Sequence, residues 1–373
     1  EKILKKFSIN IIFKNEKFHH TLTNTSQFKE KISEARILMS TSGSTGSPKL
    51  VKLSAKNLAS NASSIAKYLN LKSSDRAISS LPLHQAYGLS VMNSHLEVGG
   101  KILLSKFSVT DKNFWTIFKS QKINSLAGVP TIWRILKNLY FEKMDLPNLK
   151  YITQAGGKLD ISEIKWLSGF SKLKSIELFI MYGMTEATAR ISYYKPLLDP
   201  SKIGSIGKPI PGGRLSLLDE NNHKIDKPFI EGELIYEGDN VMLGYAEESY
   251  DLEKDNKILQ LRTGDLGYLD NDGFYWLTGR IKRFIKLAGY RFNLDDIETF
   301  LRDNKIESAV IGIDDLLVIA VIDKDIKEEF LINFLSDKFK ISFKLIKVFR
   351  VKEFPKSSAG KILYGKLKET LID

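Results

Sequence analysis

The chain has 373 residues, 43% of them hydrophobic and 27% charged, an ordinary composition for a globular protein of two or more domains. It contains no cysteine, which excludes disulfides, thiolate nucleophiles and cysteine-bound metals. The net charge of +12 suits either a phosphate-bearing partner or a solvated basic surface, and without a long basic run we expect no nucleic acid partner. No apolar run approaches the ~18 residues of a membrane span, so we expect no membrane span. A cytoplasmic setting is the default expectation, which the absence of cysteine permits.

Short apolar strands alternate with amphipathic helices through the first half of the chain. A strand at residues 36–39 leads into a glycine- and hydroxyl-rich segment, and a helix follows at residues 55–69. The further predicted strands are residues 76–81, 101–104, 125–129, 151–154 and 176–180. The further predicted helices are residues 114–120, 132–140 and 161–170. This alternation predicts parallel βαβ units.

Glycine-punctuated segments replace this alternation from about residue 204. The stretches GSIGKPIPGGRLSLLD, EGELIYEGD and GFYWLTGR predict a β-rich subdomain. A third region begins after Arg280, where Asn293 precedes two acidic residues and predicts a capped helix.

The rest of this third region predicts a small α+β domain. Residues 308–313 and 316–322 predict a strand pair, and residues 344–351 a last strand. Between them, residues 326–339 predict a helix, and one face of that helix carries Phe330, Leu331, Phe334 and Leu335. We place the domain boundary near Lys282.

Residues 41–49, TSGSTGSPK, form what we call the phosphate loop. Glycines and hydroxyl side chains let backbone N–H groups and hydroxyls converge on phosphate oxygens, and Lys49 adds a positive charge. A flexible surface linker is the alternative that this segment leaves open. The spacing is not that of a Walker A motif, because Pro48 stands five residues after Gly43 and Leu50 follows Lys49.

Four further segments accompany the phosphate loop in the same order as in a known superfamily. They are MYGMTEAT (181–188), LRTGDLG (261–267), GFYWLTGRIKRFIKLAGYR (273–291) and PKSSAGK (355–361). Together they resemble the adenylate-forming superfamily of acyl- and aryl-CoA synthetases, luciferases and peptide-synthetase adenylation domains. GSIGKPIPGG and VMLGY match linking segments of that superfamily, and the resemblance runs from about residue 37 to 368.

The resemblance implies an α/β fold and a reaction in two halves. A large α/β N-terminal domain with a β-rich subdomain would span residues 1–281, and a small mobile α+β C-terminal domain residues 282–373, with Lys282 as hinge. In the implied reaction, a small-molecule carboxylic acid attacks ATP and gives acyl-AMP and pyrophosphate. A thiol, either CoA or the phosphopantetheine of an acyl carrier protein, then displaces AMP. The implied cofactors are ATP and Mg²⁺.

The resemblance also assigns roles around the nucleotide. Glu186 is the implied magnesium-linked carboxylate, Thr185 binds the α-phosphate, and Tyr182 packs on adenine. Gly156 and Gly157, in QAGGKL, lie on the other side of the adenine. Residues implied to cradle the β- and γ-phosphates are Thr41, Ser42, Gly43, Ser44, Thr45, Gly46 and Lys49. The sequence departs from related aryl-CoA ligases at Ile180 and Met181, where those enzymes often carry polar or glycine residues.

The second half of the chain supplies the remaining implied groups. Asp265 would accept hydrogen bonds from both ribose hydroxyls, for which two carboxylate oxygens are well suited, and Arg280 would reach the ribose and phosphates. Lys361 matches the catalytic lysine, whose ammonium group neutralises charge that develops during phosphoryl transfer. Lys286 and Gly289 lie in the segment that faces the thiol acceptor, although a solvated basic face is an equal alternative.

The segment LPLHQAYGLSV bears on the substrate class. Amino-acid-activating relatives carry an aspartate for the substrate ammonium where this chain has Gly88, so an amino acid would leave its charge unpaired. The resemblance is instead to acyl- and aryl-CoA ligases. It places His84 in the acyl pocket, with a core histidine as the alternative, and adds Val129 and Met184 as pocket walls. Trp133 is another candidate wall, but aromatic and apolar residues such as these three are more often simply part of the core.

Three functions remain in competition on sequence grounds. The first is an ATP-dependent acid–thiol ligase, and the second an adenylating enzyme that serves a carrier protein or decorates a surface glycan without CoA. The third is a nucleotide-binding module without turnover, which the presence of Lys361, Glu186 and Asp265 argues against. Only 40 residues precede Thr41, where relatives carry a long stretch, so we expect either a naturally short ligase or a fragment.

Overall fold

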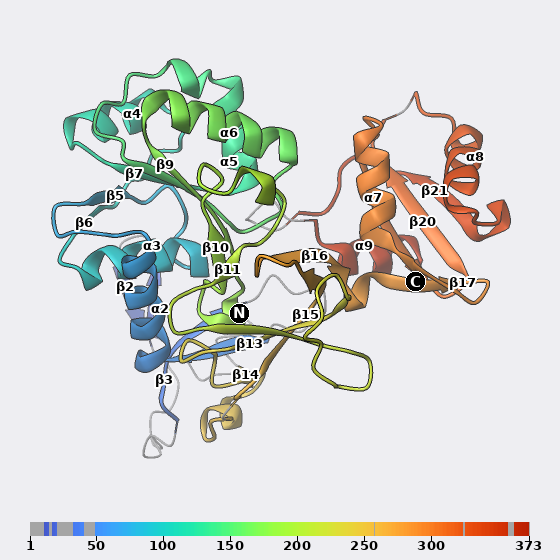
Figure 1. Cartoon of the computed structure of the whole chain (residues 1–373), viewed down its shortest axis with the longest axis horizontal. Coiled ribbons are helices and arrows are strands. Elements are labelled where there is room, and N and C mark those ends of the chain that lie inside the picture. Colours follow the sequence, from blue (N-terminus) through green and yellow to red (C-terminus); the bar gives the residue numbers. More distant parts are fainter. Residues whose placement is uncertain are drawn as a thin grey trace.

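The computed structural model describes residues 11–14, 17–20, 33–40, 49–256, 258–323, 325–356 and 362–372 (Figure 1). For residues 11–14, 17–20, 282 and 291 it describes the backbone only. Within this part of the chain, no helix is long and apolar enough to cross a membrane.

A mixed five-stranded sheet forms the centre of the first half. Its strands β7, β8 and β9 are parallel, whereas β10 and β11 are antiparallel to their neighbours. In sheet order the strands are β11 (Lys208–Pro209), β10 (Ser192–Tyr194), β9 (Glu177–Tyr182), β8 (Tyr151–Gln154) and β7 (Ser125–Gly128). Helices α5 (Pro130–Asn138) and α6 (Ile161–Lys174) connect the parallel strands, which confirms the predicted βαβ units.

Apolar faces of the helices beside this sheet bury a common core. Figure 1 shows α4 (Lys112–Ser120), α5 and α6 gathered beside β7 and β9. Phe114, Trp133 and Leu167 contribute fully buried side chains to this core. Trp133 therefore packs in this core, which favours the core interpretation over that of a pocket wall.

Two more helices lie beside a short parallel pair, β5 (Arg76–Ile78) and β6 (Lys101–Leu103). Helix α2 (Ala55–Tyr68) follows the prediction, with Ser54 and Asn57 in a reciprocal capping box. Helix α3 (Ala86–Glu97) was not predicted from the sequence. It begins after Gln85 without a side-chain cap and contains Gly88, so its formation depends on packing against α2 more than on local signals.

Antiparallel sheets make up the predicted β-rich subdomain. The four-stranded sheet consists of β12 (Arg214–Leu218), β13 (Gly232–Glu237), β15 (Leu261–Leu269) and β16 (Tyr275–Arg280). The three-stranded sheet consists of β14 (Tyr245–Ala246), β4 (Leu50–Ser54) and β3 (Ala35–Ser40). Both sheets contribute to one buried core. A separate hairpin joins β1 (Ile11–Lys14) to β2 (Lys17–His20).

The elements after residue 283 have hydrophobic cores of their own. Strands β19 and β20 form the predicted hairpin, β21 pairs in parallel with β20, and α7, α8 and α9 contact this sheet (Figure 1). The strands are β17 (Phe284–Leu287), β18 (Tyr290–Asn293), β19 (Ser308–Ile313), β20 (Leu316–Val321) and β21 (Ile346–Arg350). The helices are α7 (Leu294–Asp303), α8 (Glu328–Phe339) and α9 (Tyr364–Leu371).

Two sequence predictions in this region had different outcomes. The cap of α7 is confirmed, because the Asn293 side chain accepts a hydrogen bond of 2.9 Å from the backbone N–H of Asp295. The predicted buried face of α8 is wrong at Phe330. Leu331 and Leu335 are fully buried, but Phe330 is 55% exposed and stacks on Phe334, because the face that packs on the sheet is narrower than the sequence pattern.

Candidate active site

Three neighbouring parallel strands end among the predicted site residues. Val129 follows β7, Gly156 and Gly157 follow β8, and Tyr182 is the last residue of β9. The register pairs Gly128 with Gln154 and Gln154 with Ile180, so these carboxyl ends are adjacent. Ligands of open α/β sheets bind outside the carboxyl ends of the strands, and this edge is therefore the candidate site.

Asp265 is the centre of a polar cluster at this edge. Strand register places Asp265 on β15 opposite Arg280 on β16, and the Arg280 Nε donates to Asp265 Oδ1 at 2.6 Å. The Tyr182 hydroxyl donates to the other carboxylate oxygen, Oδ2. The Asp265 side chain is buried, whereas the Arg280 side chain is exposed and accessible to a ligand. Three predicted nucleotide-binding residues, far apart in sequence, are thus in direct contact.

Charge and burial explain the titration behaviour of this cluster. The negative charge of Asp265 raises the pKa of the Arg280 guanidinium above its usual value. Burial, and then the same carboxylate, raise the pKa of the Tyr182 hydroxyl well above its usual value. Tyr182 therefore remains a hydrogen-bond donor at neutral pH. Each carboxylate oxygen has further acceptor capacity for a ligand hydroxyl.

Glu186 is held by a segment that the sequence analysis did not assign to the site. Its carboxylate accepts a hydrogen bond of 2.8 Å from the Tyr245 hydroxyl, and its backbone oxygen accepts one of 2.9 Å from the N–H of Met242. Burial and the Glu186 carboxylate raise the pKa of Tyr245, so the hydroxyl donates. The signal for this contact lies in VMLGY, residues 241–245, which by its resemblance is only a linking segment.

Lys49, at the end of the phosphate loop, lies beside the same segment. Its ammonium group forms an ion pair of 2.9 Å with Glu247 and lies 5.9 Å from the centre of the Tyr245 ring. Strand β14, which carries Tyr245, pairs with β4, which begins next to Lys49. The pairing of β14 with β4 therefore places Lys49 and Glu186 next to the same residue, Tyr245. No motif in the sequence pointed to Glu247.

Several predicted residues lie outside the described part of the chain. These are Lys361 and the phosphate-loop residues Thr41, Ser42, Gly43, Ser44, Thr45 and Gly46. Thr185 is in a short 3-10 helix at Thr185–Ala187, next to Glu186. Lys286 is exposed on β17, and Gly289 occupies the β17–β18 turn with a φ of 83°, as a tight hairpin requires.

The predicted acyl-pocket residues surround the start of α3. His84 is exposed just before this helix, which excludes the alternative of a core histidine. A Cβ on Gly156 would lie 3.0 Å from Cγ1 of Val129 and 3.8 Å from Cδ1 of Tyr87, so these three residues are neighbours. Met184 is partly buried and packs against the core of the β-rich region.

Packing explains why position 88 is a glycine, which the sequence motif alone does not show. A Cβ at this position would lie 2.2 Å from the carbonyl oxygen of Pro82, well inside contact distance. The start of α3 thus packs directly on the backbone of residues 81–82. With this backbone, an aspartate cannot occupy position 88, so no ammonium-binding carboxylate is available there.

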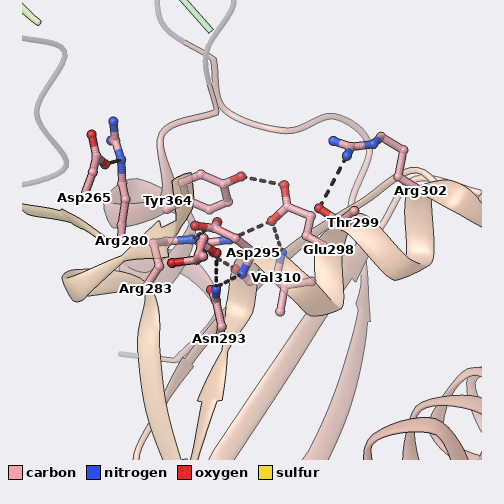
Figure 2. A network of polar contacts seen from close by, with 11 residues as sticks. Asp265, Arg280, Arg283, Asn293, Asp295, Glu298, Thr299, Arg302, Val310 and Tyr364 are labelled. Atoms are coloured by element: carbon pink, nitrogen blue, oxygen red, sulfur yellow. Dashed lines mark hydrogen bonds and ion pairs between the residues drawn. The ribbon is translucent and has the colours of Figure 1, made fainter. Parts of the chain in front are cut away.

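Two arginines anchor the chain on either side of Lys282. Arg280 pairs with Asp265, as described above, whereas Arg283 contacts Asp295 and Glu298 at 2.8 Å each (Figure 2). Ile281 and Lys282 separate the two anchored residues. The backbone of Lys282 is therefore the link between two fixed points, while its role as a hinge stays a prediction.

The described residues suit a magnesium ion that arrives with phosphates. Among them, no group of three His, Cys, Asp or Glu side chains could hold a metal by itself. Magnesium in nucleotide sites is commonly held by one or two carboxylates together with phosphate oxygens and water. Glu186, oriented by Tyr245, is a suitable single carboxylate for this arrangement.

Comparison with known proteins identifies the family. Residues 9–246, more than half of the chain, match the AMP-binding enzyme family. The chain belongs to this family of adenylate-forming enzymes. The oxalate–CoA ligase of Saccharomyces cerevisiae is 30% identical over 354 residues, and the long-chain-fatty-acid–CoA ligase of Bacillus subtilis is 29% identical over 352 residues. These matches cover 91% and 89% of this chain but only 63% and 61% of the two relatives.

Solved structures confirm the mixed α/β fold. O-succinylbenzoate coenzyme A synthetase from Bacillus subtilis in complex with AMP has a TM-score of 0.75 at 26% identity. The same synthetase in complex with ATP and magnesium ion has a TM-score of 0.73 at 25% identity. Each match covers 91% of this chain and 70% of the synthetase, so the AMP-binding chain shares most of its length with these structures.

Proposed function

We propose that this AMP-binding enzyme activates a small carboxylic acid with ATP and transfers the acyl group to a thiol. In the first half-reaction a carboxylate oxygen forms a bond to the α-phosphorus of ATP. The bond from that phosphorus to the bridging oxygen breaks, and pyrophosphate leaves. In the second half-reaction the thiol attacks the acyl carbon, and AMP leaves with the proton balance completed by solvent.

The contact of Tyr182, Asp265 and Arg280 is the observation that supports this proposal most directly. It provides a buried carboxylate, a neutral hydroxyl and an accessible guanidinium beside the carboxyl ends of three parallel strands. We propose that Asp265 accepts the ribose hydroxyls and that Arg280 reaches the ribose and phosphates. The Tyr182 hydroxyl would orient Asp265 through its hydrogen bond, while the Tyr182 ring packs on one face of the adenine. Gly156 and Gly157 would lie on the other face of the adenine.

The phosphate end would depend on groups from both halves of the chain. We propose that Glu186 binds the magnesium that accompanies ATP, and that magnesium supplies charge neutralisation of the phosphates. Tyr245 would hold the Glu186 carboxylate in place, and Lys49 would exchange its contact with Glu247 for a phosphate oxygen. Thr185 and Lys361 would stabilise the charge that develops around the α-phosphorus.

Pyrophosphate exchange across a panel of carboxylic acids tests this function. We expect ATP-dependent exchange with at least one acid, and a loss of roughly 10²–10³-fold in rate for Lys361→Ala, because one transition-state charge contact is removed. Nucleotide binding by this variant, measured by equilibrium titration with ATP, should change little. Nucleotide binding without any exchange would favour the alternative of a module without turnover.

The same panel distinguishes simple acids from amino acids. We propose that free α-amino acids are rejected, because Gly88 leaves no carboxylate for the ammonium group and its surroundings leave no room for one. Faster exchange with a proteinogenic amino acid than with every simple acid would contradict this part of the proposal.

The acceptor is tested separately, with acyl-AMP formed in a single turnover. CoA and a phosphopantetheine-bearing carrier protein are offered in parallel, and consumption of acyl-AMP is followed. We propose that Lys286 and Gly289 face the thiol and that rotation at Lys282 brings them to the site. Lys282→Pro, which fixes φ at the link, should slow the transfer step more than the adenylation step. An equal loss in both steps would contradict the hinge.

A further inference from the structure

A buried arginine without a counter-ion lies beside the candidate acyl pocket. Arg190 is 3% exposed, and its backbone oxygen accepts hydrogen bonds from the side chains of Asn61 and Asn240. These two contacts hold the backbone in place, and the low exposure shows that the side chain lies inside the protein. Among the described residues no carboxylate pairs with the guanidinium, and its Nε has no hydrogen-bond partner.

The surroundings of Arg190 are aromatic and neutral. Its Cζ lies 3.9 Å from the centre of the Tyr87 ring, and the Tyr68 hydroxyl lies within hydrogen-bonding reach of the guanidinium. Burial raises the pKa of Tyr87 to about 12 and that of Tyr68 further, although Arg190 opposes both shifts. Neither hydroxyl therefore carries a negative charge at neutral pH. An arginine cannot avoid the cost of burial by losing its proton, so the positive charge remains uncompensated.

A small cavity adjoins the guanidinium. It has a volume of about 10 Å³, room for one water-sized group, and it lies between the inner side of α3 and strands β7 and β8. Its polar lining includes Ser90, Ser94, His95 and Thr153. Burial lowers the pKa of His95, so this histidine does not carry a second positive charge at neutral pH. Most of the lining is apolar, including Leu69, Leu126 and Met181, and Arg190 provides the positive charge beside a few polar groups.

Tyr87 links this cavity to the candidate acyl pocket. One edge of its ring lies near Gly156 and Val129, and Arg190 stacks on its face. Its hydroxyl donates to the backbone oxygen of Thr153 at 2.8 Å, and Thr153 lines the cavity. A substrate that enters beside Val129 would therefore reach Arg190 by passing the edge of a single aromatic ring.

We propose that Arg190 binds a second carboxylate of the acid substrate, so that the enzyme prefers a short dicarboxylic acid. This inference rests on the proposed function, and it names the substrate class of the same site. One carboxylate oxygen of the substrate occupies the cavity and pairs with the guanidinium, while the other carboxylate reacts with ATP. The limited space favours a compact acid over one with a long apolar chain.

Pyrophosphate exchange with matched acids tests the inference on the unmodified protein. Oxalate, malonate, succinate and glutarate are compared with acetate, propionate, butyrate and valerate. We expect kcat/KM for the best dicarboxylic acid to exceed that of the monocarboxylic acid of equal carbon number by roughly 10-fold or more, as a buried charge pair requires. Exchange with monocarboxylic acids alone would overturn the inference and leave the proposed function standing. Absence of exchange with all eight acids would overturn the inference alone, because the wider panel of carboxylic acids described above tests the proposed function.

Variants of Arg190 test whether this residue causes the preference for dicarboxylic acids. For Arg190→Met we expect roughly a 10²-fold loss with the dicarboxylic acid and a change within about threefold with its monocarboxylic partner. Arg190→Lys should retain part of the preference, because the charge remains. Arg134→Met is the matched control, since Arg134 already pairs with Glu163 at 2.8 Å, and it should leave the ratio unchanged. If Arg190→Met improved longer monocarboxylic acids and left the ratio unchanged, Arg190 would be only a space-filling residue and the inference would be wrong.

Discussion

Two buried arginines of this chain have similar aromatic neighbours and different electrostatic surroundings. Arg283 and Arg190 are 8% and 3% exposed, and each places its Cζ 3.9 Å from the centre of a tyrosine ring. Arg283 also contacts Asp295 and Glu298 at 2.8 Å, and its NH1 donates to the backbone oxygen of Val310 at 2.6 Å (Figure 2). Arg190 has no comparable acidic partner among the described residues.

The difference separates an internal role from a ligand-binding role. The Glu298 carboxylate that holds Arg283 also accepts a hydrogen bond of 2.6 Å from the Tyr364 hydroxyl, so the network ties α7 to α9. In this network the positive charge of Arg283 is paired with carboxylates of the protein itself, Asp295 and Glu298. At Arg190 the negative partner is missing, and the residue lies beside the candidate acyl pocket. A buried cation of this kind is better explained by a substrate than by stability.

The largest expected effect is on the network around Arg283. Arg283→Met leaves two carboxylates without their partner, which should lower the free energy of unfolding by about 3 kcal/mol. Urea denaturation, followed by tryptophan fluorescence and circular dichroism, measures the loss. Arg350→Met is the control, because Arg350 is exposed, and it should change stability by less than about 0.5 kcal/mol. A loss no larger than that of the control would contradict the structural role of Arg283.

The second largest effect is expected when a carboxylate is introduced beside Arg190. Ser90 lines the cavity beside Arg190, so Ser90→Asp places a carboxylate near the unpaired guanidinium. In a double-mutant cycle with Arg190→Met, we expect a favourable coupling of about 2 kcal/mol in unfolding free energy. The Ser90→Asp variant should also lose its preference for dicarboxylic acids. A coupling near zero would mean that Arg190 already has a partner.

Arg280 is an intermediate case, an exposed arginine with a single buried carboxylate partner. Arg280→Met should cost about 1 kcal/mol of stability, because solvent screens the exposed end and Tyr182 still donates to Asp265. The effect on nucleotide use should be larger, with roughly a 10-fold rise in KM for ATP. An unchanged KM together with a large loss of stability would assign Arg280 to the fold instead of the site.

The smallest expected change in stability is that of Arg190→Met alone. This substitution removes a buried charge and leaves no carboxylate unpaired, so the free energy of unfolding should change by less than about 1 kcal/mol in either direction. Thermal and urea denaturation without substrate measure it. A loss comparable to that of Arg283→Met would show that the two arginines have the same role, and the comparison would fail.

The sequence by itself determined the family, the order of most elements and several site residues. Short apolar runs between helices predicted β7, β8 and β9, and Asn293 before two acidic residues predicted the start of α7. These features are local, because a cap or a strand pattern needs only a few consecutive residues. The motifs around Tyr182, Asp265 and Arg280 also identified one cluster before the structure placed its members in contact.

Tertiary structure decided what depends on residues far apart in the chain. Helix α3 forms by packing on α2, and Gly88 fits there because the backbone of Pro82 lies against it. Tyr245 reaches Glu186 through the pairing of β14 with β4, which no local pattern encodes. The missing counter-ion of Arg190 is also a property of its surroundings. Sequence shows which charges a chain carries, but only the folded structure decides which of them lose water and find a partner.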